Sequence, residues 1–77
     1  MSSLEEQLKE ERRLVARAQG RVQNQLGFIE QLALDGLETT QAERFLRILL
    51  QEMGVSMERV EALERLTHAR EASVINL

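Results

Sequence analysis

Two apolar heptad stripes, separated by a short break, constrain the fold of this chain more than any other feature. In the first segment, residues recur in 3-4 spacing at Leu4, Leu8, Glu11, Val15, Ala18, Val22, Gln25, Ile29 and Leu32. In the second, the same spacing runs through Ala42, Leu46, Leu49, Met53, Ser56, Val60, Leu63 and Thr67. This spacing brings each set onto one side of an α-helix, as in a coiled coil. The sequence therefore predicts two long helices.

Local signals mark where the first helix begins and ends. Ser3 and Glu6 form a capping box, in which the serine hydroxyl accepts from the Glu6 amide. At the other end, Gly36 suits the left-handed residue that follows a helix, and Leu37 is expected to fold back on Leu32 in a Schellman closure. The first helix should therefore end just before Gly36.

The second helix is predicted to begin within about six residues of that stop, which favours an antiparallel turn. Thr40 and Glu43 form a second capping box, with Thr39 as an alternative cap. The chain is therefore expected to be one all-α domain over 1–77. Its predicted parts are a helix over about 3–34, a turn over 35–39, a helix over about 40–70 and a tail over 71–77.

Two positions in the second half leave alternatives open. Gly54 lies inside the second stripe, so a break there with Ser56 as a new cap is the alternative to one continuous helix. The tail is expected to fray, although its apolar side chains, Val74, Ile75 and Leu77, can also dock on the hairpin.

Composition excludes several classes of site. The 77 residues include no Cys and one His, His68, so disulfides, thiolate sites and a four-ligand zinc site are not expected. The net charge of −3 disfavours a general nucleic-acid binder. No apolar run has the length of a membrane span, and no secretion signal opens the chain, so we expect a cytoplasmic protein. We expect no cofactor, no small-molecule substrate and no enzymatic activity.

The stripes leave too many apolar residues over for a lone hairpin. Two packed helices hide only the strip between them, and a wider apolar face is typical of a helix that touches two neighbours. We therefore expect the antiparallel hairpin, which is coiled-coil-like, to dimerise into a four-helix bundle, since two-fold dimers are the commonest oligomers. The predicted dimer or partner surface consists of Leu14, Phe28, Phe45, Ile48, Leu50 and Met57.

Polar residues within the stripes have a simple interpretation. Glu11 and Gln25 occupy seam positions, where a polar residue fixes register and oligomer state and weakens stability. The basic run from Lys9 to Arg21 is interleaved with acids, so a solvated face paired with the other helix is favoured over a phosphate-binding patch. His68 is interpreted as a cation favoured near a helix C-terminus.

The turn and second helix resemble a class of short bacterial hairpin proteins, many from alpha-proteobacteria, whose function is unassigned. The matching pattern is Gly36-x-x-Thr39-x-x-Ala42-x-x-x-Leu46-x-x-Leu49, followed by His68-Ala69-Arg70. It covers about half the chain, which departs from it at Gly54. The resemblance implies a bacterial origin and a hairpin fold, and adds no biochemical activity.

The sequence thus favours an interaction protein with an unidentified protein partner, acting as a small adaptor or regulator. The alternative is an acidic inhibitor of a nucleic-acid-handling protein, which would mimic phosphate through Glu58, Glu61 and Glu64.

Overall fold

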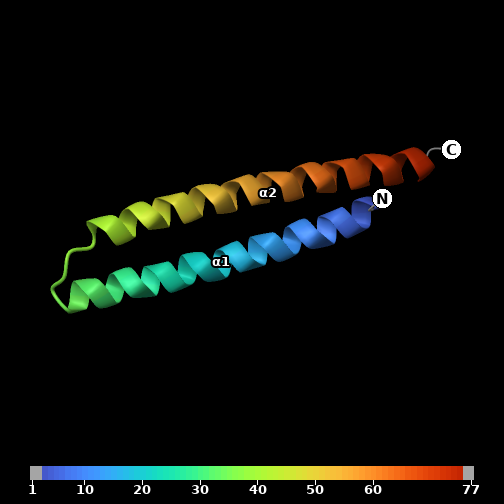
Figure 1. Ribbon diagram of the computed structural model, residues 1–77. Helices are drawn as coiled ribbons and strands as arrows, with labels where there is room; N and C mark the ends of the chain where they lie inside the picture. The colour runs from blue at the N-terminus through green and yellow to red at the C-terminus, as the bar shows by residue number, and fades with distance from the viewer. Residues whose placement is uncertain (1–2, 76–77) are drawn as a thin grey trace.

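The chain folds as an antiparallel hairpin of two long helices (Figure 1). This computed structural model describes residues 3–75, and the side chains of 3–72. α1 spans Leu4–Leu34 and α2 spans Thr40–Ile75, with no strand in the described part. The molecule measures 64 × 18 × 15 Å, and its radius of gyration of 18.0 Å exceeds the roughly 11.5 Å of a compact domain this long. The predicted all-α hairpin is confirmed.

The N-terminus of α1 is closed by the predicted cap. The Glu6 amide donates to Ser3 Oγ at 3.1 Å, and Ser3 has extended backbone angles. Glu5 and Glu6 lie in the first turn, where the exposed amides of the helix attract negative charge. The first turn thus has a partner for one of its free amides and a favourable electrostatic environment.

The C-terminus of α1 ends in the predicted Schellman closure. The Leu37 amide donates to the Leu32 carbonyl at 2.9 Å, and the Gly36 amide donates to the Ala33 carbonyl at 3.1 Å. Gly36 has φ of +71°, a left-handed conformation that glycine adopts without strain against a Cβ. The glycine therefore both ends α1 and turns the chain toward α2.

The start of α2 differs from the first of the two caps considered. Thr40 is the first helical residue, and its amide and hydroxyl both donate to Glu38 Oε1. The Glu43 amide instead donates to the Thr39 carbonyl at 2.9 Å, and the Thr39 hydroxyl donates to Glu43 Oε1 at 3.1 Å. The prediction of a Thr40 cap is wrong, and the alternative, Thr39, occupies the cap position.

α2 is longer and more regular than its sequence predicted. It passes through Gly54 without a break, so the alternative of a new start at Ser56 is wrong. It also continues to Ile75, where the sequence predicted an end near Arg70 and fraying beyond it. Its last turn projects past the start of α1 (Figure 1). The proposed docking of Val74, Ile75 and Leu77 lies outside the described side chains.

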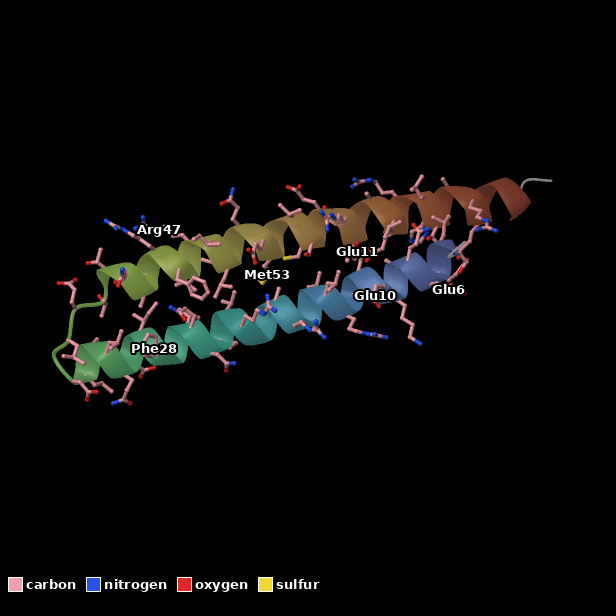
Figure 2. The ribbon with its side chains drawn as sticks, viewed as in Figure 1. Glu6, Glu10, Glu11, Phe28, Arg47 and Met53 are labelled. Atoms are coloured by element: carbon pink, nitrogen blue, oxygen red, sulfur yellow. The ribbon has the colours of Figure 1, made fainter. Side chains whose placement is uncertain are left out.

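The two predicted stripes face each other in the predicted register. Val15 and Val60 line one recess between the helices, and Val22 and Met53 line another. Met53 points from α2 toward α1 (Figure 2). The buried residues of the described part are Leu8, Val22, Ala42 and Leu49, which remain 6–8% exposed, and most other seam residues are half-buried. The hairpin core is therefore a single narrow strip.

Candidate interaction surface

Large apolar side chains outside the seam remain in contact with solvent. Their exposed fractions run from 43% at Leu50 and Met57 to 75% at Leu34. The set is Leu26, Phe28, Leu34, Leu37, Phe45, Ile48, Leu50, Val55, Met57 and Leu66. Among the described side chains, these exposed apolar residues outnumber the four buried residues of the core.

The residues predicted for this surface divide between two opposite faces of the hairpin. Positions seven apart keep the same orientation to the seam, because the seam itself repeats every seven residues. Phe28 and Phe45 line one recess, and Leu14 lies two heptads before Phe28 on the same side. We call this side the Phe face. It consists of Leu14, Phe28, Phe45, Ile48, Val55 and Leu66.

Leu50 and Met57 lie on the other side, with Leu26. Met57 lines the recesses that contain Arg12 and Gln19, which lie on the side of α1 opposite Phe28. We call this side the Met face, defined by Leu26, Leu50 and Met57. The predicted set therefore does not form one continuous patch.

Some members of the Phe face were missed by the sequence reasoning. Val55 is 44% exposed and Leu66 is 55% exposed, and neither was among the predicted surface residues. The available signals were two heptad repeats on α2, in which Leu66 repeats the position of Phe45 and Val55 repeats that of Ile48. Leu14, which was predicted to belong to this surface, is less exposed than the others and is half-buried.

The accessible area shows how much surface the hairpin leaves uncovered. The chain exposes 6185 Å², whereas a globular protein of 8.9 kDa exposes about 4,800 Å² by the usual scaling. The excess is about 1,400 Å² for each chain. Stable homodimers bury roughly 1,000–2,500 Å² on each partner, and the excess falls within that range.

The two polar seam residues have different environments. Gln25 Nε2 donates to the Ala42 carbonyl at 2.9 Å, which links the two helices near the turn. Glu11 Oε2 is buried and has no hydrogen-bond partner among the described residues. The Gln25 amide thus has a hydrogen-bond partner across the seam, whereas the unpartnered oxygen of Glu11 makes the packing of the two helices less favourable.

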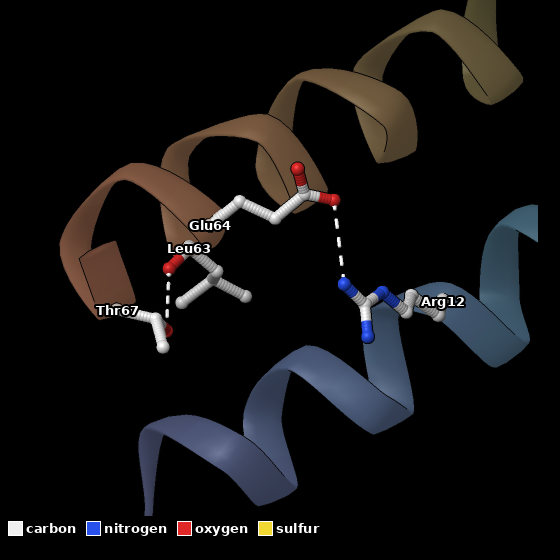
Figure 3. A network of polar contacts seen from close by, with 4 residues as sticks. All are labelled: Arg12, Leu63, Glu64 and Thr67. Atoms are coloured by element: carbon white, nitrogen blue, oxygen red, sulfur yellow. Dashed lines mark hydrogen bonds and ion pairs between the residues drawn. The ribbon is translucent and has the colours of Figure 1, made fainter. Parts of the chain in front are cut away.

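The charged residues are partly paired within the chain. Arg12 on α1 pairs with Glu64 on α2 at 3.5 Å (Figure 3), and Arg13 pairs with Glu10 on its own helix at 3.4 Å. The Arg12 pair involves one member of the basic run and one of the three acids suggested as phosphate mimics. Both sets therefore lose part of their net charge to contacts inside the hairpin.

The Glu38 carboxylate at the turn accepts hydrogen bonds that change its pKa. Hydrogen bonds from the Thr40 hydroxyl and amide, and one from the Thr39 amide, lower the pKa of Glu38 from its ordinary value of 4.5. These bonds favour the charged carboxylate at the N-terminus of α2. These hydrogen bonds therefore belong to helix capping.

Within residues 3–75, no group of three or more His, Asp or Glu side chains is arranged to hold a metal ion. In the same residues, neither helix has the length of apolar sequence needed to cross a bilayer. Comparison with protein-family models, curated proteins and solved structures finds no match for this chain.

Proposed function

We propose that this chain is a non-enzymatic protein–protein interaction module. It acts as a homodimeric helical bundle, in the role of a small adaptor or regulator. The observation that supports this proposal is the apolar surface outside the seam, where ten large side chains among residues 3–72 are at least 43% exposed. Water disfavours such a surface by about 25 cal/mol for each Å², so covering it with another polypeptide is favourable.

The small core points in the same direction. A chain of 77 residues is near the size at which a single core gives marginal stability, and small domains commonly add disulfides, metals or a second subunit. The absence of Cys excludes disulfides. A second chain that covers the exposed faces supplies the missing apolar burial.

The test is the mass of the purified chain by light scattering, measured over a wide concentration range together with binding of a hydrophobic dye. The proposal predicts a species of twice the chain mass of 8.9 kDa that dissociates on dilution, with dye binding that increases as it dissociates. A monomer at every concentration that binds no dye would contradict it.

A further inference from the structure

We propose that the covering surface is a second copy of this chain, packed with its α2 antiparallel to the first α2 across the Phe face. This inference rests on the proposed homodimer and specifies which face, which helix and which register form it. The order of residues along α2 supports this pairing, because it is complementary to itself when reversed.

Two rows of α2 residues lie on the Phe face. The first row repeats every seven residues as Phe45, Glu52, Arg59 and Leu66. Read in reverse it is Leu66, Arg59, Glu52 and Phe45. In an antiparallel pair of copies, Phe45 then lies opposite Leu66 of the second copy, and Glu52 lies opposite its Arg59. Two-fold symmetry repeats both contacts, as an isologous interface requires.

The second row agrees with the same axis. It consists of Ile48, Val55 and Ala62. In the register that pairs Glu52 with Arg59, Ile48 faces Ala62 of the other copy, and Val55 faces its own counterpart. Large side chains thus alternate with small ones, as packed helices require. Thr40 falls opposite Glu71, so nearly the whole of α2 takes part.

Other registers oppose like charges. A shift by one heptad in one direction places Glu52 opposite Glu52 of the second copy, and a shift in the other places Arg59 opposite Arg59. In a parallel arrangement of the two α2 helices, Glu52 faces Glu52 and Arg59 faces Arg59 of the second copy. Like charges at an interface disfavour association strongly. Among these arrangements, the antiparallel register above is the one that pairs both charges of the first row, Glu52 and Arg59, with opposite charges.

Glu52 and Arg59 are also available for this role. Both are exposed, and neither belongs to an ion pair among the described side chains. On their own helix, the positions three and four residues away carry no charge, so intrahelical pairing does not compete. Arg21 lines the same recess as Glu52 and adds a second cation near that carboxylate.

The first test uses single cysteines, since the chain has none of its own. Under mild oxidation, Val55→Cys is expected to form a disulfide-linked dimer at least about ten times faster than Ile48→Cys, because the two Val55 lie at the axis within disulfide reach. The two Ile48 lie about 21 Å apart along the helices. A mixture of Ile48→Cys and Ala62→Cys should cross-link to each other. Equal rates for Val55→Cys and Ile48→Cys would overturn the register.

The second test reverses the charges. Glu52→Arg and Arg59→Glu should each weaken self-association at least about tenfold, because each opposes like charges twice in the dimer. Mixing the two variants should restore a heterodimer of wild-type affinity, since Arg at 52 then faces Glu at 59 and the remaining pair is native. Circular dichroism confirms that each variant is helical.

These outcomes separate the inference from the proposed function. A wild-type monomer at all concentrations would contradict both. A wild-type dimer in which both variants associate normally, and mixing changes nothing, would overturn the α2 interface and leave the proposed homodimer standing.

Discussion

The Phe face and the Met face lie on the same two helices and differ in how their residues are ordered. On the Met face of α2, the row beside the seam is Glu43, Leu50, Met57 and Glu64. An antiparallel second copy that brings Leu50 against Met57 also brings Glu43 against Glu64, which opposes two acids. The Phe face combines four exposed apolar side chains of α2 with one acid and one base placed symmetrically between them.

The difference also extends to intrachain pairing. On the Met face, Glu64 is already paired with Arg12 (Figure 3). On the Phe face, Glu52 and Arg59 have no ion-pair partner among the described side chains. Apolar exposure alone therefore does not identify an interface here, since both faces have it. In the proposed dimer, it is the arrangement of charges that favours the Phe face over the Met face.

The largest expected effect comes from matched substitutions on the two faces. Ile48 and Leu50 are similar aliphatic residues on α2 with exposed fractions of 51% and 43%. Ile48→Glu should raise the dimer dissociation constant at least about 100-fold, because it places a charge in the interface twice. Leu50→Glu should change it by no more than about threefold. Sedimentation equilibrium measures both, and equal weakening would remove the distinction between the faces.

A second variant should change the stability of the hairpin without changing which face forms the proposed dimer. Glu11→Leu removes the buried carboxylate oxygen that has no partner and adds apolar contact in the seam. The free energy of unfolding should rise by about 1–3 kcal/mol, as measured by urea denaturation at fixed chain concentration. The contrast between Ile48→Glu and Leu50→Glu should persist in this background. A loss of stability would show that Glu11 has a structural role that the seam geometry does not reveal.

Gly54 provides a smaller test from outside the Phe face. A Cβ added at Gly54 meets no atom within 4 Å, and alanine stabilises a helix interior by about 1 kcal/mol relative to glycine. Gly54→Ala should therefore raise the melting temperature and leave the dimer constant unchanged. If alanine at 54 instead dissociates the dimer, a second chain approaches α2 on the side that we assign to solvent.

The smallest effect is expected at the turn, which belongs to neither face. Because the folded-state pKa of Glu38 is lowered, its charged form contributes stability above the ordinary pKa of 4.5, and this contribution is lost as pH falls through the lower folded-state value. Glu38→Gln should thus melt slightly lower than the wild type near neutral pH, with the difference vanishing in acid. Thermal melts at several pH values measure it, and a constant difference would contradict the capping role.

Much of the fold could be predicted because short-range signals agreed with the long-range pattern. The Gly36 stop and the two stripes each favour a hairpin, and the stripes fix the register that places Val22 beside Met53. The choice between Thr39 and Thr40 as cap could not be made from the sequence, because both residues suit a cap and only the structure shows that the Thr39 hydroxyl contacts Glu43 whereas the Thr40 hydroxyl contacts Glu38. The helical state of 71–75 was also missed, because fraying was assumed where no stop signal existed.

The candidate surface was harder to predict than the fold. The sequence indicated surplus apolar residues without assigning them to faces, because Leu50 and Met57 lie outside the heptad stripe just as Phe28 and Phe45 do. Assigning faces requires the position of each residue relative to the seam of both helices. Gln25 and Glu11 likewise had the same seam position in the pattern, and only the structure shows that one has a partner and the other does not.

The most direct test of the account uses the two phenylalanines of the chain, Phe28 and Phe45, which both lie on the Phe face. Incorporation of fluorophenylalanine makes fluorine NMR a probe of that face alone. With a soluble paramagnetic agent present, the account predicts that both signals are protected at high chain concentration and broadened on dilution. Signals that broaden equally at every concentration would show that no second copy covers this face.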